Sequence, residues 1–237
     1  MGFEKVLEKI FPGALGEVGF VQKTYSELKP MGFRSENTIV SVCICRDEIS
    51  QSVRSIIKHV WGEAFNLSSL AGMFFAGKTG IKAAMHHAPI TDGKERYVFY
   101  GMSHIAIDSE GRIGTCRRTG RQEESVACGA LAAFQEEMAG GRLDVSLDIE
   151  DVEQSLIKMR LIKKITYGRI PELLELTKIT LSAIQEDLEN TLKGVVDTEK
   201  SDYALITGIQ VHGPDGNYVW PSSSYAIVNR ERHEIKL

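Results

Sequence analysis

The stretch Thr38-Ile-Val-Ser-Val-Cys-Ile-Cys45 decides the fold. Its largely apolar character, rich in β-branched residues, predicts a strand buried on both faces, as the strands of parallel sheets are. Arg46-Asp-Glu48 interrupts the apolar run, and residues 49–61 then carry apolar side chains at helical spacing. The segment therefore predicts a strand, a turn and a helix, which is the repeating unit of an α/β fold.

Later segments continue this alternation of strand and helix. The apolar run over 70–76 predicts a second strand, residues 78–87 a short helix, and residues 96–107 a third strand. We expect Ser125 to cap a further helix that runs to about Gly140. The sequence thus predicts an α/β fold with a mainly parallel β-sheet flanked by helices.

Helical additions precede and follow this core. Two short helices are expected within residues 3–31, and amphipathic helices are expected over 149–165 and 171–193. Strands at 203–211 and 225–228 predict a terminal hairpin. We therefore expect a single domain over 1–237, with N-terminal helices at 1–35, an α/β core at 36–140, and helices plus the hairpin at 141–237.

Composition restricts the class of partner. The chain has 237 residues, 43% hydrophobic content and a formal net charge of −4, so it lacks the basic balance expected of proteins that bind nucleic acid. No apolar stretch reaches the roughly 18 residues of a membrane span, and Met1-Gly-Phe-Glu-Lys5 lacks the order of a secretory signal. We expect an intracellular protein of the cytoplasm or plastid stroma, not a secreted one, whose partners are small solutes.

Three residues form a candidate metal site: Cys45, His104 and Cys128. Each lies where an apolar run gives way to a turn or to a helix start, and ligands bind at that edge of an open α/β sheet. Two thiolates and one imidazole favour zinc, and three protein ligands leave a fourth position for water. The alternatives are that Cys128 is a small residue in a tight packing contact and that His104 is a hydrogen-bonded core histidine.

Neighbouring residues supply further candidates. Asp47 is two residues after Cys45, so strand alternation places both side chains on one side, where Asp47 could orient a water or simply cap a helix. Cys43 lies deeper in the apolar run and is expected in the core, and Cys116 is expected to bind no metal. His86 and His87 are either helix-terminal cations or a proton relay to solvent.

A competing motif occurs at Gly72-Met-Phe-Phe-Ala-Gly-Lys-Thr79, which matches the phosphate-binding loop of nucleotide hydrolases. Under that hypothesis Lys78 would bind nucleotide phosphates together with magnesium. The four variable residues are apolar, whereas the loop needs exposed backbone N–H groups. We therefore interpret the match as a coincidence.

The chain resembles the limiting-CO2-inducible protein B/C family, which is related to theta-class and β-type carbonic anhydrases. The resemblance extends over most of residues 10–230. The most specific segments are Phe11-Pro-Gly-Ala-Leu15, Cys45-Arg-Asp-Glu-Ile49, Asn66-Leu-Ser-Ser-Leu-Ala-Gly72, Ala76-Gly-Lys-Thr-Gly80, Ala84-Met-His-His-Ala-Pro89, His104-Ile-Ala-Ile-Asp108, Ala127-Cys-Gly-Ala-Leu131 and His212-Gly-Pro-Asp-Gly216.

This resemblance implies a β-carbonic-anhydrase-like fold, a homodimer, and Zn2+ held by Cys45, His104 and Cys128. It also implies that Asp47 accepts a hydrogen bond from the activated water. The β-class motif C-x-D-x-R is not complete here, because Ile49 stands where the arginine belongs.

The missing arginine leaves the partner of Asp47 open. We expect Arg46 to take that role as a catalytic residue, with Arg54 as the second choice. Phe74, Phe75 and Leu131 are expected as apolar walls for the substrate.

The function expected from the resemblance is reversible hydration of CO2 to bicarbonate in inorganic-carbon metabolism. The alternative is a catalytically silent, zinc-stabilised assembly or regulatory protein of the same fold, because a fold does not guarantee its chemistry.

Overall fold

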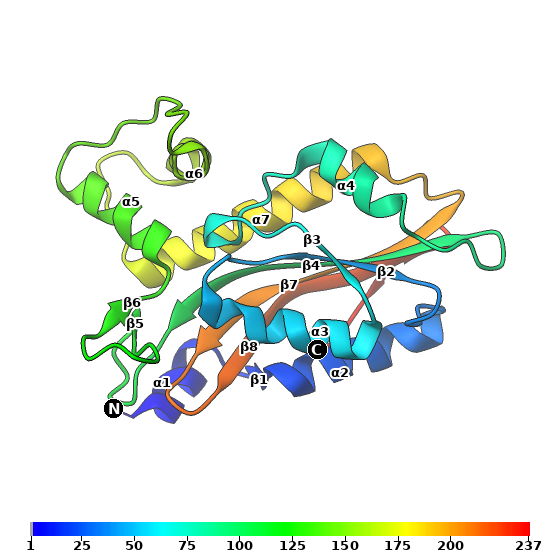
Figure 1. Ribbon diagram of the computed structural model, residues 1–237, viewed down its shortest axis with the longest axis horizontal. Coiled ribbons are helices and arrows are strands. Elements are labelled where there is room, and N and C mark those ends of the chain that lie inside the picture. Colours follow the sequence, from blue (N-terminus) through cyan, green and yellow to red (C-terminus); the bar gives the residue numbers. More distant parts are fainter. Residues whose placement is uncertain (1) are drawn as a thin grey trace.

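The computed structural model describes residues 2–237, in which helices cover both faces of a seven-stranded sheet (Figure 1). The strand order is β1-β8-β7-β4-β2-β3, and β9 pairs with β8. The pairs among β3, β2, β4 and β7 are parallel, whereas β8 runs antiparallel to its neighbours. The strands are β1 (Leu15–Gly16), β2 (Ile39–Cys43), β3 (Ala64–Asn66), β4 (Glu95–Ala106), β7 (Ser201–His212), β8 (Asn217–Val228) and β9 (Glu231–Glu234). The expected α/β fold is confirmed.

Seven α-helices surround the sheet within the described part of the chain. They are α1 (Phe3–Ile10), α2 (Glu17–Leu28), α3 (Gln51–Trp61), α4 (Gly77–Met85), α5 (Gly129–Ala139), α6 (Val152–Leu161) and α7 (Leu173–Val195). Figure 1 shows α4 and α7 on one face of the sheet and α2 and α3 on the other. None of the helices in residues 2–237 combines the length and the apolar character needed to cross a lipid bilayer.

Alternation along β4 explains why its sequence is apolar throughout. Tyr97 and Phe99 enter the hydrophobic core formed with α4 and α7, whereas Val98 and Tyr100 enter the core formed with α2 and α3. Successive side chains of a strand point to opposite faces, so a strand covered on both sides is apolar at nearly every position. The same argument predicted β2, and the structure confirms it.

The register of the parallel strands determines which residues meet at the sheet edge. β4 and β7 pair over twelve residues, from Glu95 opposite Ser201 to Ala106 opposite His212. β2 pairs with the first part of β4 and ends at Cys43, opposite Gly101. The carboxyl ends of all three strands therefore lie along one edge of the sheet.

Two local predictions are wrong. The expected strand at 70–76 begins with a 3-10 helix, η3 (Leu70–Gly72), and β3 is the strand that pairs with β2 on the side opposite β4. The N–H groups of Gly72 and Met73 bond to the carbonyls of Ser69 and Leu70, so they cannot join a β-ladder. The apolar character of this segment reflects its burial, which periodicity alone cannot distinguish from a buried strand.

The second wrong prediction is the Ser125 cap. Ser125 belongs to β6 (Ser125–Val126), which forms a small ribbon with β5 (Thr115–Cys116), and α5 begins four residues later at Gly129. Cys128 itself is the residue that precedes the helix.

The same local structure argues against a nucleotide loop at 72–79. Met73 is fully buried, Phe74 is 6% exposed, and Gly72 adopts a φ of +73°. A Cβ at Gly72 would overlap the carbonyl oxygen of Met102 in β4. The first glycine of the motif is thus required by packing against the sheet, and Met73 and Phe74, which follow it, are buried and cannot present their backbone to a phosphate.

We expect Gly72→Ala to lower the free energy of unfolding by at least about 2 kcal/mol, because both the left-handed backbone and the contact with Met102 oppose a Cβ. Chemical denaturation measures the change. Gly19→Ala is the matched control, because Gly19 lies in α2 with open space around it and should be neutral or stabilising. Equal stabilities of the two variants would contradict the packing argument.

Candidate metal centre

Three different elements bring the sulfur and nitrogen atoms of the candidate metal site together. Cys45 follows β2, His104 lies near the end of β4, and Cys128 immediately precedes α5. Their ligand atoms all lie within 4.8 Å of one another, and the three residues are at most 2% exposed. The convergence of these residues, predicted from the sequence, is present in the fold.

This donor set fits zinc. Tetrahedral coordination with Zn–S near 2.3 Å and Zn–N near 2.0 Å places ligand atoms roughly 3.5–4 Å apart, which is compatible with the observed cluster. Nε2 of His104 is buried and finds no hydrogen-bond partner among residues 2–237. Because a buried nitrogen without a partner is costly, this atom is explained well by a metal bond.

The two cysteines influence each other's ionisation. A hydrogen bond with Cys128 lowers the pKa of Cys45 to about 4, and His104 acts in the same direction. The neighbouring Cys45 and burial raise the pKa of Cys128, although the N–H groups of Ala130 and Leu131 oppose this rise. One negative charge is therefore favoured in the cluster by the protein alone, and a bound cation would stabilise the second.

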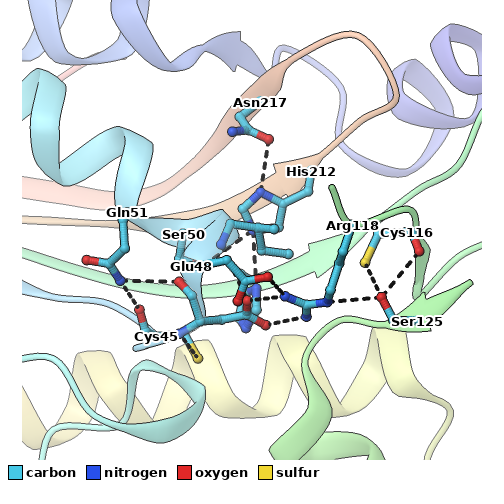
Figure 2. Close-up of polar contacts among 12 residues, drawn as sticks. Cys45, Glu48, Ser50, Gln51, Cys116, Arg118, Ser125, His212 and Asn217 are labelled. Atoms are coloured by element: carbon cyan, nitrogen blue, oxygen red, sulfur yellow. Dashed lines mark hydrogen bonds and ion pairs between the residues drawn. The ribbon is translucent and has the colours of Figure 1, made fainter. Parts of the chain in front are cut away.

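Asp47 lies beside the cluster in a clamp made by Arg118. Arg118 Nη1 and Nη2 donate to the two carboxylate oxygens at 2.7 and 2.8 Å, and its Nε donates to Ser125 Oγ at 2.9 Å (Figure 2). Burial acts to raise the pKa of Asp47, but the bonds from Arg118 hold it well below its usual range. The backbone N–H of Asp47 also lies 3.5 Å from Cys45 Sγ. Asp47 is thus a fixed carboxylate next to a candidate metal ligand.

The expectation that Arg46 pairs with Asp47 is wrong. Arg46 forms an ion pair with Glu153 of α6 at 2.7 Å, and its side chain is 60% exposed. The chain turns after Cys45, so the side chains of Arg46 and Asp47 point in different directions. The partner of Asp47 is Arg118, which lies between β5 and β6. Arg54, the second choice, belongs to α3 and makes no ion pair with Asp47 among residues 2–237.

A cavity of about 630 Å³ opens in front of the cluster and is lined by Cys45, Asp47 and Cys128. Its charged lining includes Arg118 and Arg121. The apolar part of the lining is Leu70, Val126 and Ala130.

The expected walls Phe74, Phe75 and Leu131 do not line this cavity. Phe74 and Leu131 belong to the same hydrophobic core as Cys45, and Phe75 packs against that core. These side chains therefore pack in or against the hydrophobic core that contains Cys45, and they are not part of the cavity wall.

The expected relay residues lie far from the cluster within this chain. His86 lines a hollow together with Glu95, the first residue of β4, whereas His104 is nine residues further along the same strand. Nine residues of strand span about 30 Å. His87 packs beside Phe65 of β3, with ring centroids 5.8 Å apart. Neither histidine can exchange protons directly with the cluster in one chain.

Sequence reasoning assigned no role to His212, which contacts the metal site. This residue ends β7, is 5% exposed, and places Nε2 3.2 Å from Nδ1 of His104. Burial lowers the pKa of His212 to about 3. Two signals for His212 were present in the sequence, its position directly after the predicted strand 203–211 and its place in the segment His212-Gly-Pro-Asp-Gly216 of the family resemblance. Neither signal indicated its partner, because the contact with His104 joins residues 108 positions apart.

The other two cysteines lie outside the cluster. Cys43 is buried, its Sγ donates to the carbonyl of Gly72 at 3.3 Å, and burial raises the pKa of its thiol to about 12. Cys116 is half-buried, and its Sγ lies 3.5 Å from Ser125 Oγ. The placement of Cys43 agrees with its expected position in the core.

The comparison with protein families identifies the family of this chain. The family described as limiting CO2-inducible proteins B/C beta carbonic anhydrases matches residues 14–228. The chain belongs to this family. The resemblance that the sequence motifs indicated is confirmed.

Solved structures agree with this family. The crystal structure of limiting CO2-inducible protein LCIB has 31% sequence identity and a TM-score of 0.81, with 97% of each chain covered. PtLCIB4, a homolog of LCIB, has 22% identity and a TM-score of 0.85, with 99% of this chain and 100% of that chain covered, and it supports the fold. No curated protein matches the chain significantly.

We expect the purified protein to contain about one zinc ion per chain, held at this cluster. Cys128→Ser should lose most of the zinc, because an alcohol does not replace a thiolate ligand, and elemental analysis after dialysis measures the loss. Cys116→Ser is the matched control and should retain the metal. Equal zinc contents in the two variants would place the metal elsewhere.

Proposed function

We propose that this family member catalyses the zinc-dependent, reversible hydration of CO2 to bicarbonate. The observation that carries the proposal is the Asp47–Arg118 clamp beside the Cys45–His104–Cys128 cluster. Bound zinc would supply a water activated at neutral pH, since coordination lowers its pKa from 15.7 to about 7. The chain's own residues would orient that water and exclude competing ligands.

Asp47 has two roles in this proposal. It accepts a hydrogen bond from the reacting water, and so directs the water's lone pair toward the substrate. The clamp also keeps Asp47 from becoming a fourth metal ligand, because Arg118 holds both of its carboxylate oxygens. A site with three protein ligands retains an open position, which a hydrating reaction requires.

The cavity suits the change in charge between substrate and product. CO2 is apolar and meets Leu70, Val126 and Ala130, whereas bicarbonate is an anion and meets Arg118 and Arg121. Arg121 forms no ion pair with any acidic side chain in residues 2–237, so its charge is available to an anion. Arg118 pairs with both Asp47 and Glu48, and the available charge of Arg121 would favour an anionic product at this end of the cavity.

We expect Asp47→Asn to reduce the rate of CO2 hydration about 100-fold or more with zinc retained, because the amide cannot orient the water as the carboxylate does. Arg118→Gln should lose about 10- to 100-fold by releasing Asp47. Stopped-flow hydration assays on protein of measured zinc content test both variants.

Arg46→Gln is the matched comparison. It removes an arginine from the same cavity but leaves the partner of Asp47 in place, so it should cost much less than Arg118→Gln. Wild-type protein that holds zinc but shows no hydration between pH 6 and 9 would refute the enzymatic proposal and favour the silent, zinc-stabilised assembly or regulatory role.

We also propose that two copies of the chain form a homodimer, as the family resemblance implies. Residues 145–152 expose apolar side chains, including Leu147 at 56% and Ile149 at 83%. Exposed apolar side chains that recur within one segment are candidates for a contact site, and a second copy is the partner that the resemblance indicates.

Sedimentation velocity should give about twice the chain mass of 26.3 kDa for the wild type. Leu147→Glu together with Ile149→Glu should yield monomer, because a charge opposes burial at an interface. Ile90→Glu is the control, since Ile90 is equally exposed, at 71%, in a different loop. A double variant that remains dimeric would place the interface on another surface.

A further inference from the structure

We propose that a chain of buried hydrogen bonds ending at His212 fixes the ring tautomer of His104, so that Nε2 of His104 presents a lone pair to the metal. The inference rests on the proposed zinc site and adds positioning residues to it. These residues lie outside the cluster and come from α2, α3, β7 and the start of β8.

The contact between the two histidines requires a definite arrangement of hydrogens. Nδ1 of His104 lies 3.2 Å from Nε2 of His212, and the rings meet edge to face, at 73° with centroids 5.3 Å apart. A hydrogen bond between two ring nitrogens needs one N–H and one lone pair. If His104 donates, its Nε2 has the lone pair; if His212 donates, Nε2 of His104 has the hydrogen and cannot bind a metal.

The partners of His212 select the first arrangement. Nδ1 of His212 lies 3.0 Å from Oδ1 of Asn217 (Figure 2), and Nδ2 of Asn217 donates to Ser52 Oγ at 3.0 Å. An amide oxygen accepts only, so His212 donates from Nδ1 and keeps a lone pair at Nε2. His104 must then donate from Nδ1.

Glu17 explains why the amide of Asn217 does not flip. This carboxyl lies at the start of α2, is 5% exposed, and accepts a hydrogen bond from Gln210 Nε2 at 3.2 Å. Burial raises the pKa of Glu17, and the polar side chains of Ser52, Gln210 and Asn217 oppose the rise by stabilising the carboxylate. A carboxylate only accepts, so a flipped Asn217 amide would turn its oxygen from His212 toward an acceptor. Glu17 therefore favours the orientation in which Oδ1 of Asn217 faces His212 and Nδ2 donates to Ser52.

A neutral partner is suited to this ligand. Metal-bound histidines commonly donate their second N–H to a carboxylate, a carbonyl or a water. Here two thiolates would already balance the charge of a divalent zinc ion, and the nearby charge of Asp47 is balanced by Arg118. An imidazole acceptor fixes the ring of His104 without adding another anion to the buried site.

The first test measures the tautomer directly in zinc-free protein, by two-bond 1H–15N correlation of histidine rings, with His104→Gln used for assignment. We expect His104 to hold its hydrogen on Nδ1. Glu17→Gln should convert His104 to a mixture of tautomers, because a carboxamide at position 17 can also donate. Glu27→Gln, an exposed carboxyl-to-amide change on the same helix, should leave the tautomer unaltered. A wild-type His104 with its hydrogen on Nε2 would overturn the inference, whatever the protein catalyses.

The second test measures zinc affinity by competition with a chelator. His212→Leu removes the acceptor for His104 and should weaken zinc binding about 10- to 100-fold. His212→Gln should recover part of this loss, because its amide oxygen can accept near the position of Nε2. Affinities of folded His212→Leu and His212→Gln within twofold of wild type would overturn the inference. Wild-type protein that binds zinc with this pattern but does not hydrate CO2 would refute only the proposed function.

Discussion

The parallel pairing of β4 with β7 is the interaction on which the site depends. Its twelve-residue register places the end of β7 beside the end of β4, so that His212 reaches His104. β2 pairs along the other side of β4 and delivers Cys45 to the same edge. Parallel strands present their carboxyl ends at a common edge, and in open α/β folds this edge binds ligands. A slip of one residue in the β4–β7 ladder would point His212 to the opposite face.

The sheet supplies only part of the site, and the remainder comes from a segment that crosses its edge. The β5–β6 ribbon brings Arg118 to Asp47, and the chain then continues directly to Cys128 and α5. Ser125 joins these parts, because its hydroxyl accepts from Arg118 within the ribbon that leads to the cysteine. Cys128, one of the three candidate ligands, and Arg118, which holds the carboxylate, are thus parts of one continuous segment, and their positions depend on each other.

The sequence allowed prediction of those features that have a local signal. Apolar runs predicted β2 and β4. Cys45, Asp47 and His104 were found because they lie at or near the ends of these runs. Arg118 could not be found in this way, because it lies 71 residues from Asp47 and reaches it through a ribbon of two-residue strands. His212 is 108 residues from His104, and only the sheet register joins them. The apolar residues 70–76 were misread for a different reason: burial makes a 3-10 helix and a strand equally apolar.

The contact between Arg118 and Asp47 also determines which substitutions would alter the site. Arg118 is shared between Asp47 and the exposed Glu48, whose side chain is 70% accessible. An exposed ion pair contributes little, whereas the half-buried, bidentate contact with Asp47 is shielded from solvent and fixed in two directions. Losing the Glu48 contact would therefore leave the clamp intact. If the cluster binds zinc as we propose, losing Arg118 would free a carboxylate next to three ligands and one open coordination position, which the carboxylate could fill. Under the same proposal, the arginine that keeps Asp47 charged would also keep the fourth position open, and the chemistry of the site would depend on a contact that contributes no atom to the metal.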